Sequence, residues 1–422
     1  MAEVSVWAYP WDLHDIGVAE ASDRIAAVGA GMVSLAVSYH AGRFVQPGNP
    51  RRRVYYPQDG TVYYRVDPAR WQGAEIAPLQ ADIVASEGDM LAGMIGRRDA
   101  GGLAVSCWTV CLHNTRLGMA HPGHVMRTAL GDPAYYGLCP SSAAVRAYVV
   151  GMVAEIAQVY APDRIELESP DFMGFAHGFH HEKDGLPLLA EDGFLLGVCF
   201  CRHCLRAATA AGIPAEDARL WVAGHLERAF ARELPVVQFP EFVRLGMAAF
   251  AALPEVFAYL MWRSTPVTAL VAEIRSAVPL ATRLLLIDAE GTWASGVDRP
   301  ALVPHLDGIL HCAYRTAPAD IAALMAQRRA LLGPDKTLIA GLQLYAPNIR
   351  DRADLATRLG SIAGLVDGVN FYGLGLVPPA RLDWIRTALG DAGDPGKRHD
   401  FSAKNLSSAR RLSYGSRTGE LP

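Results

Sequence analysis

Short apolar runs alternate with longer amphipathic patterns along most of the chain. Eight runs have the length and composition of buried strands, and most are followed by a pattern with the period of a helix. The predicted strands are Val4–Tyr9, Met32–His40, Gly102–Trp108, Asp163–Glu168, Arg283–Glu290, Leu306–Tyr314, Thr337–Tyr345 and Asp367–Tyr372. The predicted helices are Ala19–Gly29, Leu79–Arg97, Ser141–Tyr160, Pro318–Leu332, Arg352–Leu365 and Pro379–Leu389.

Eight strand–helix units predict an α/β fold of the (β/α)8 TIM barrel type. The alternative is a doubly wound open sheet. That fold usually carries a Gly-rich phosphate-binding turn after its first strand, and no such turn follows Tyr9. The barrel is therefore the favoured prediction.

Two long insertions interrupt the alternation, one after strand two and one after strand four. Residues 41–75 place two aromatic runs, Val54–Tyr56 and Val62–Tyr64, on either side of Asp59-Gly60, which predicts a β-hairpin. Residues 170–281 hold a histidine-rich loop, a cysteine cluster and several helical patterns. We therefore expect a barrel of residues 1–392 with both insertions over its active face. The tail 393–422, rich in Ser, Gly and Arg, is predicted to be disordered.

The fourth predicted strand contains the residue that most needs an explanation. Ile165 and Leu167 point to one side of the strand, and Glu166 and Glu168 point to the other. A parallel strand covered by helices leaves no bulk solvent for its second face. Glu168 also ends its strand, and barrel enzymes keep their catalytic residues at the carboxyl ends of strands. Glu168 is thus a candidate catalytic acid.

Three cysteines lie within six residues, as Cys199-Phe-Cys201-Arg-His-Cys204. This spacing is typical of a zinc site, which would become tetrahedral and structural with a fourth ligand. The candidates for that ligand are Cys139, Cys111, Cys107 and His203. We expect the Zn2+ to hold together an insertion that has little core of its own.

The order of these features resembles the β-galactosidases of glycoside hydrolase family 42 and related barrel glycosidases. The segment Tyr135–Tyr148 with Cys139 precedes a helix, a strand ending in Glu168 and the Cys-x-Cys-x-x-Cys motif, so the resemblance covers about residues 100–205. It implies that Cys139, Cys199, Cys201 and Cys204 bind zinc. It also implies that Glu168 is the general acid/base.

Two positions depart from the family pattern. The family has Asn directly before its strand-four Glu, where this chain has Leu167. The family nucleophile is a Glu at the end of strand seven, where this chain reads Gly341-Leu-Gln343-Leu-Tyr345 without a carboxylate. Because glycosidases need two carboxyl groups, Asp288 and Glu290 at the end of strand five are the candidates for the second.

Other polar and aromatic residues lie at or just after predicted strand ends. The aromatic side chains Trp7, Trp11, Trp108 and Trp293 offer flat apolar faces near the same rim. A pocket of this kind suits a carbohydrate, which has apolar C–H faces and many hydroxyls. The predicted substrate-binding residues are His40, His113, Asn114, His177, His180, His181, Tyr314, Gln343, Tyr345, Asn370 and Tyr372.

Composition narrows the cellular context. A formal net charge of −4 without long charged blocks argues against nucleic acid or an anionic membrane as a partner. The amino-terminal region shows no signal-peptide pattern, and no apolar stretch is long enough to cross a bilayer. Seven cysteines then indicate reduced thiols or metal, and we expect a cytoplasmic protein. A homo-oligomer is compatible with the sequence.

Three functions are compatible with these patterns. The first is a glycoside hydrolase that cleaves a small glycoside or oligosaccharide with Glu168 as its acid. The second is a metal-dependent lyase or isomerase in which the histidine loop and a carboxylate bind a catalytic cation. The third is a non-catalytic sugar-binding barrel that lacks the strand-seven nucleophile.

Overall fold

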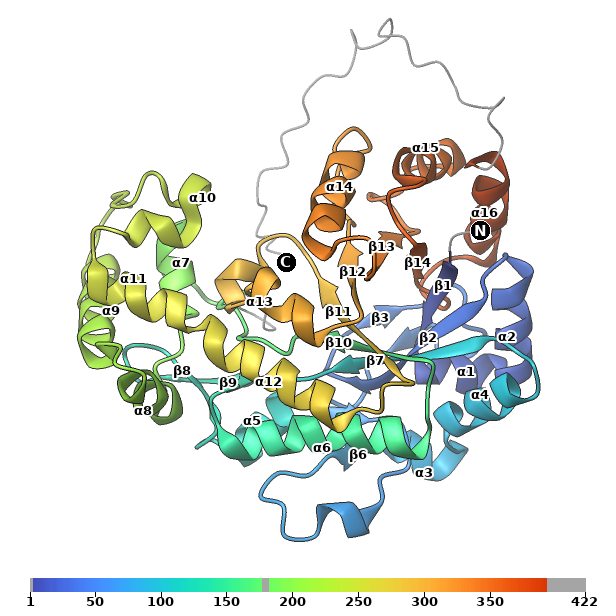
Figure 1. The fold of residues 1–422 in the computed structure, drawn as a ribbon, viewed down its shortest axis with the longest axis horizontal. Helices are drawn as coiled ribbons and strands as arrows, with labels where there is room; N and C mark the ends of the chain where they lie inside the picture. Colours follow the sequence, from blue (N-terminus) through green and yellow to red (C-terminus); the bar gives the residue numbers. More distant parts are fainter. Residues whose placement is uncertain (1–2, 177–181, 393–422) are drawn as a thin grey trace, which may run out of the picture.

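Eight parallel strands form a closed barrel, as predicted. The structure, a computed structural model, describes residues 3–176 and 182–392. Pairing of the first strand with the second closes the ring (Figure 1). The order around the barrel is β1 (Glu3–Ala8), β14 (Gly368–Tyr372), β13 (Thr337–Gln343), β12 (Gly308–Cys312), β11 (Arg283–Asp288), β10 (Arg164–Glu168), β7 (Ala104–Val110) and β2 (Met32–Tyr39). The eight predicted strands are therefore confirmed, with ends that shift by a few residues.

The strands are almost continuously apolar because both of their faces are buried. Residues such as Ile165, Leu167, Leu284 and Leu286 face outward and pack under the helices in the largest hydrophobic cluster. Inward-facing Leu285, Leu310 and Ile339, from β11 to β13, fill one half of the barrel interior. The other half is polar.

Helices surround this barrel. They are α1 (Pro10–Ile16), α2 (Val18–Ala27), α3 (Asp82–Glu87), α4 (Met90–Asp99), α6 (Ala143–Val159), α12 (Ser264–Ala277), α13 (Arg299–Leu302), α14 (Ile321–Leu332), α15 (Arg352–Ile362) and α16 (Pro379–Ala392). The single helix predicted over Leu79–Arg97 was wrong. Residues 79–80 form strand β6 (Leu79–Gln80), and Gly88 with a φ of 104° separates α3 from α4.

The hairpin predicted in the first insertion was also wrong. The first aromatic run contains β4 (Val54–Tyr55), which pairs with β3 (Phe44–Val45), whereas β5 (Thr61–Val62) in the second run pairs with β2 and β6. The different burial of the two aromatic runs explains why they pair with different strands. Tyr63 and Tyr64 are almost fully buried, while Val54 is exposed. Tertiary packing of the second run thus outweighs the local turn signal of Asp59-Gly60.

The second insertion forms a helical lobe at the left of Figure 1. Its helices are α7 (Ala190–Leu196), α8 (Arg202–Ala210), α9 (Ala215–Phe230), α10 (Phe242–Leu245) and α11 (Pro254–Trp262). Strands β8 (Val125–Arg127) and β9 (Pro133–Leu138) and the short helix α5 (Thr115–Ala120) come from the segment that follows β7. The lobe has its own hydrophobic cluster, which includes Leu226, Phe250 and Tyr259. The expectation that this insertion has little core was therefore wrong.

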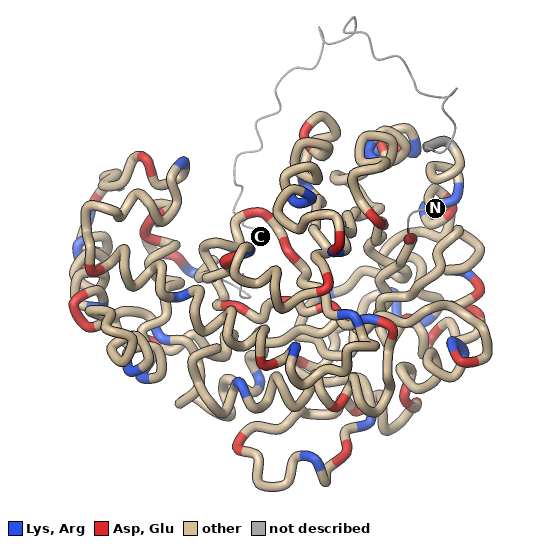
Figure 2. Tube along the Cα trace, in the orientation of Figure 1, with Lys and Arg blue, Asp and Glu red and all other residues tan. Residues whose placement is uncertain are grey.

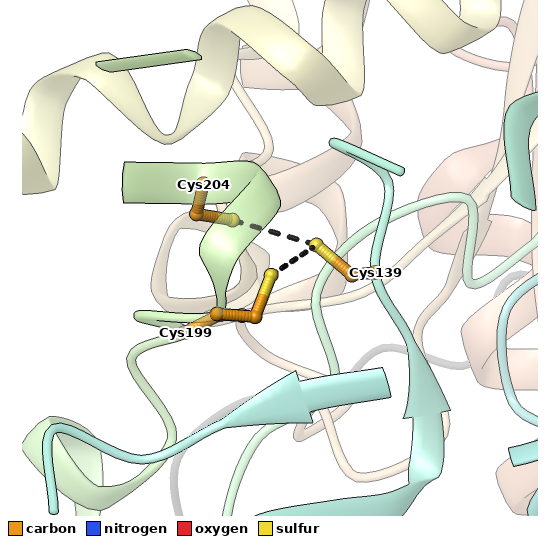
Figure 3. A group of neighbouring side chains, drawn as sticks. Cys139, Cys199 and Cys204 are labelled. Atoms are coloured by element: carbon orange, nitrogen blue, oxygen red, sulfur yellow. Dashed lines mark hydrogen bonds between the residues drawn. The ribbon is translucent and has the colours of Figure 1, made fainter. Parts of the chain in front are cut away.

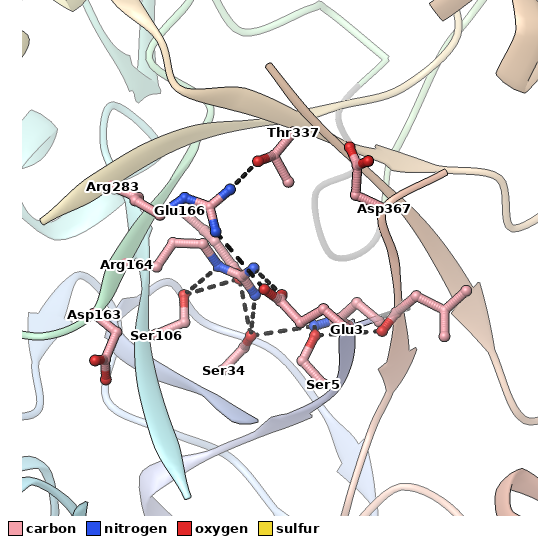
Figure 4. A network of polar contacts seen from close by, with 12 residues as sticks. Glu3, Ser5, Ser34, Ser106, Asp163, Arg164, Glu166, Arg283, Thr337 and Asp367 are labelled. Atoms are coloured by element: carbon pink, nitrogen blue, oxygen red, sulfur yellow. Dashed lines mark hydrogen bonds and ion pairs between the residues drawn. The ribbon is translucent and has the colours of Figure 1, made fainter. Parts of the chain in front are cut away.

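A buried ion pair occupies the polar half of the barrel interior. The Arg164 guanidinium lies 2.7 Å from the Glu166 carboxylate, and neither side chain is exposed. Ser34 and Ser106 each donate a hydrogen bond of 2.9 Å to Glu166, and Arg164 also pairs with Glu3 (Figure 4). Neighbouring strands thus supply the partners that a buried charge needs.

Charged residues of both signs are interspersed along the described chain (Figure 2). Within 3–176 and 182–392, no single helix is long and apolar enough to cross a membrane. The segments 242–250 and 254–277 reach the required length and composition only as a pair, and they are bent by 103°.

We predict that Glu166→Gln destabilises the protein by about 3–5 kcal/mol, because it removes the fully buried one of the two carboxylates that pair with Arg164. Urea unfolding followed by circular dichroism measures the change. Glu216→Gln is the matched control, since it breaks an exposed pair with Arg219 on α9 and should cost about 1 kcal/mol or less. Equal stability losses in the two variants would contradict the importance of the interior pair.

Candidate functional site

Glu168 is the last residue of β10 and lies at the carboxyl-terminal mouth of the barrel, as predicted. Its side chain is only partly exposed, and the indole N–H of Trp108 donates a hydrogen bond to its carboxylate. Burial raises the pKa of Glu168, and the charge of Glu166 acts in the same direction. His40 and the Trp108 hydrogen bond act against this rise, but the net shift is upward. A carboxyl with this shift can hold a proton at a higher pH than a free Glu.

Two tryptophans connect Glu168 to the ion pair below it. The Trp7 indole N–H donates a hydrogen bond of 2.8 Å to Glu166. The Trp7 ring packs against the Trp108 ring at a centroid distance of 5.2 Å, and Trp108 in turn bonds to Glu168. The interior charge therefore fixes the orientation of the side chains beneath the mouth.

Aromatic side chains fill the mouth between β1, β2 and β14. The Tyr9 hydroxyl shares hydrogen bonds with the hydroxyls of Tyr39 and Tyr372. Trp11 stacks on Tyr9 at 4.5 Å. Trp7, Trp11 and Trp108 are almost fully buried, so these predicted rim tryptophans pack below the surface.

Several predicted substrate-binding residues do gather at this mouth. The partly exposed Tyr372 ring stacks on Tyr314 at 6.0 Å and lies near Tyr345. His40 stacks between Tyr39 and His113, at 4.4 Å and 4.0 Å. Gln343 accepts a hydrogen bond from the Asn348 amide in the loop after β13. Their contacts with substrate stay predictions.

Two predicted substrate-binding residues have structural roles instead. The Asn370 amide is completely buried and donates hydrogen bonds to Ser5 and Ser34, so it lies inside the barrel below the mouth. Asn114 caps helix α5 by accepting from the Leu117 N–H, and its amide donates to the Gly60 carbonyl. The predictions for Asn114 and Asn370 are corrected accordingly. His177, His180 and His181 lie outside the described residues.

Asp288 and Glu290 belong to an ion-pair network behind the barrel wall. Asp288 follows the alternation of Leu284 and Leu286, so its side chain faces the helices. It pairs with Arg299 at 3.0 Å and with His311 at 2.7 Å. Burial acts to raise its pKa, but the His311 hydrogen bond and the Arg299 charge outweigh burial and lower it.

Glu290 is bound to the same network but is more exposed. Its side chain is 64% exposed and pairs with Arg328, which also lies 3.4 Å from Asp288. The expectation that both carboxylates face the barrel mouth was wrong. An apolar run predicts a strand, but it does not show which side chains face the barrel interior or at which residue the strand ends.

Asp171 is a candidate that the sequence reasoning missed. It lies three residues after Glu168 and is only 8% exposed. Burial raises the pKa of Asp171 to about 8, and the negative charges of Asp288 and Glu168 also raise it. Perturbed carboxyls at the carboxyl end of a barrel strand are typical of catalytic sites. Its place in the loop that directly follows Glu168 was the available signal.

The four predicted zinc ligands converge on one point. The sulfurs of Cys139, Cys199, Cys201 and Cys204 are buried and all lie within 4.8 Å of one another. Cys139 follows β9, whereas the other three lie before or within the start of α8. The thiols of Cys139, Cys199 and Cys204 point toward one another (Figure 3). Hydrogen bonds from the neighbouring thiols hold the pKa of Cys201 well below its usual range.

This arrangement fits zinc. Four sulfurs at about 2.3 Å from one ion would lie about 3.8 Å apart in a tetrahedron. The Cys139 sulfur is 3.4 Å from those of Cys201 and Cys204, so little movement is needed. The other candidate fourth ligands lie elsewhere. His203 contacts the Gly123 carbonyl, Cys111 contacts the Thr109 carbonyl, and Cys107 packs in the barrel wall.

Solved structures with a similar fold include two β-galactosidases and an α-L-fucosidase. The β-galactosidase of the psychrophilic Marinomonas ef1 has a TM-score of 0.55 and 13% identity, over 92% of this chain and 59% of that chain. The β-galactosidase of Halorubrum lacusprofundi has a TM-score of 0.57 and 12% identity, over 92% and 58%. The α-L-fucosidase isoenzyme 2 of Paenibacillus thiaminolyticus has a TM-score of 0.52 and 12% identity, over 93% and 49%.

The chain thus spans about half to three-fifths of the length of these enzymes. No protein-family model and no curated protein matches the sequence. The structural neighbours confirm the resemblance to β-galactosidases at the level of the fold. At this identity they show the fold alone.

We predict that purified protein contains one zinc per chain and that Cys201→Ser lowers its thermal stability more than its affinity for substrate. The reason is that four thiolates leave no open position on the metal for chemistry. Elemental analysis and thermal unfolding provide the measurements. Cys111→Ser, which alters an equally buried thiol outside the cluster, should retain the zinc. Metal-free protein with four freely titratable thiols would refute the site.

We predict that Asp171→Asn stabilises the protein progressively as pH rises from about 4 to 8. A pKa raised from about 3.9 in the unfolded chain to about 8 in the folded one favours folding at low pH, and this contribution is lost as pH rises through 8. Asn carries no charge to bury. At about 1.4 kcal/mol per pKa unit, the gain at pH 8 relative to pH 4 should reach a few kcal/mol.

Urea unfolding at several pH values measures this difference. Asp217→Asn on the exposed face of α9 is the control and should show no comparable trend. Parallel stability curves for wild type and Asp171→Asn would show that Asp171 ionises normally.

Proposed function

We propose that this protein is a glycoside hydrolase that cleaves a small glycoside or oligosaccharide with a pair of carboxyl groups. The observation that supports this most directly is the placement of Glu168. It ends a barrel strand, is partly exposed at the mouth, and has a pKa raised by burial and by the Glu166 charge. Such a carboxyl can protonate the oxygen of a leaving group.

We assign the second carboxyl to Asp171 rather than to Asp288. Asp288 is bound by Arg299 and His311 on the helix side of the wall, whereas no ion pair within bonding distance engages Asp171 among the described residues. Burial and the charges of Asp288 and Glu168 raise the pKa of Asp171 to about 8, so this carboxyl retains a proton near neutral pH. Glu168 is the more exposed of the two and is therefore the proposed proton donor. Asp171 acts as the second carboxyl in its ionised form, which a pKa of about 8 favours only at alkaline pH.

The aromatic mouth supports a carbohydrate as substrate. The rings of Tyr314, Tyr345 and Tyr372 are partly exposed there, and phenol hydroxyls can bond to sugar hydroxyls while ring faces pack on C–H groups. The fold shared with glycoside hydrolases is consistent with such a ligand. Zinc at the four cysteines would connect β9 to α8 and hold the lobe in place.

One observation favours a second candidate, a non-catalytic sugar-binding barrel. Gln343 stands at the end of β13, where the resembled family has its nucleophile, and its side-chain oxygen is already bonded to Asn348. If Asp171 does not supply the second carboxyl, the mouth would bind sugars without cleaving them. A panel of aryl glycosides distinguishes the two candidates.

We predict that Glu168→Gln lowers turnover of unactivated glycosides by about 10²–10⁴-fold, the usual contribution of general acid catalysis. Activated aryl glycosides should be affected less, because their leaving groups depart with little protonation. The measurement is kcat/KM for a series of glycosides whose leaving-group pKa values differ.

Asp171→Asn is the matched variant and should lower turnover for all leaving groups alike. If the loss of turnover depends on the leaving group in Asp171→Asn but not in Glu168→Gln, then Asp171 is the proton donor and Glu168 is the second carboxyl. Near wild-type turnover of an unactivated glycoside by Glu168→Gln would exclude Glu168 as the acid.

A further inference from the structure

A large aromatic cavity lies among the loops of the active face and has no assigned role. Its volume is about 910 Å3, and it is lined by segments that follow the carboxyl ends of β7, β10 and β11, together with α7 and α10. These segments all belong to the active face of the barrel. The aromatic lining consists of Tyr135, Tyr136, Phe175, Phe194, Phe242 and Trp293.

The cavity walls are held together by contacts between these segments. The Tyr136 hydroxyl donates a 3.2 Å hydrogen bond to the Gly174 carbonyl, which joins β9 to the loop after β10. The Phe172 N–H donates a 3.0 Å bond to the Ser295 carbonyl, which joins that loop to the one after β11. Trp293 packs on Phe194 at 5.4 Å and on Phe242 at 6.0 Å. These contacts hold the described walls of the cavity in place without a ligand.

The loop that follows Glu168 contributes part of the cavity wall. Asp171 and Phe172 follow Glu168, and Gly174 and Phe175 line the cavity wall. A general acid must contact the oxygen of the leaving group, so the leaving group has to lie on the same side of the mouth as the acid. In this fold that side is the one formed by the loops after β7, β10 and β11.

We propose that this cavity binds the leaving group of the substrate and that the leaving group is a neutral aromatic aglycone. The proposal rests on the function proposed above. In the reaction, water adds to the anomeric carbon and gives one proton to the second carboxylate as the bond from that carbon to the glycosidic oxygen breaks. The aglycone departs as a phenol that carries the proton of the acid.

The lining explains the choice of an aromatic aglycone over a second sugar. A sugar in such a cavity needs several convergent hydrogen-bonding groups, whereas this lining is mainly apolar and the Tyr136 hydroxyl is already bonded to Gly174. Flat rings such as Trp293 and Phe194 favour a flat apolar ligand. Glu182 and Asp184, both exposed at the rim, disfavour an anionic one.

Binding of free 2-naphthol tests the cavity without requiring hydrolysis. Titration calorimetry on the full-length protein should show one saturable site. Trp293→Ala should weaken binding at least tenfold, since loss of one buried aromatic contact is worth about 1.4 kcal/mol or more. Tyr135→Ala alters a more exposed lining residue, so it tests the cavity with less risk to folding. Trp384→Ala, on α16 and outside the cavity, is the matched control and should bind normally.

The kinetic test compares 2-naphthyl and methyl glycosides of the same sugar. The ratio of their kcat/KM values should fall about tenfold in Trp293→Ala and stay unchanged in Trp384→Ala. Unsaturable naphthol binding by wild type, or unchanged binding in both cavity variants, would overturn the proposal. Naphthol binding that depends on Trp293 in a protein that cleaves no glycoside would support the aromatic site and overturn the hydrolase function.

Discussion

The arrangement of the candidate site depends on a charge pair buried inside the barrel. TIM barrel interiors are usually filled by layers of branched apolar side chains, but here Arg164 and Glu166 occupy the polar half. Burial of both charges is tolerable only if their remaining hydrogen-bonding positions are satisfied. Ser34, Ser106 and the Trp7 indole satisfy Glu166. Because Trp7 must point down to this carboxylate, its ring supports Trp108, and Trp108 bonds to Glu168. The interior pair thus determines the geometry of the mouth.

The parts of the fold that could be predicted from the sequence are those that local patterns determine. The eight strands were predictable because burial on both faces makes them continuous apolar runs, and the two glutamates of β10 were conspicuous within such a run. Local signals failed where tertiary packing decided the outcome. The Asp59-Gly60 turn did not produce a hairpin, because Tyr63 and Tyr64 pack in the core and draw β5 to the edge of β2. Sequence alone does not indicate such distant partners.

The residues of the candidate site were predictable only where a local pattern, such as side-chain alternation or ligand spacing, determines their positions. Side-chain alternation correctly placed Glu166 and Glu168 on the face of β10 opposite Ile165 and Leu167, and the end of β10 was identified to the residue. On β11 the same rule was applied without knowing which face began the strand, and Asp288 proved to lie with Leu284 and Leu286 on the helix side. Cys199, Cys201 and Cys204 were predictable because metal-ligand spacing is a local signal, whereas Cys139 is distant in sequence and was assigned from the family resemblance. Asp171 was missed because a loop carboxylate has no such pattern.

The turn after Glu168 shows how one segment could supply both carboxyls. Ser169 has a φ of 49°, in the left-handed region that residues other than glycine rarely adopt, and strained backbone of this kind is common at functional sites. The turn takes the chain off the axis of β10, and the Phe172 N–H then bonds to Ser295 in the loop after β11. Asp171 is thereby drawn toward the fifth strand, where the charge of Asp288 affects it more than that of Glu168 does. In the resembled family the two carboxyl groups come from strands four and seven. In this protein the two proposed carboxyl groups come from strand four and the turn that follows it.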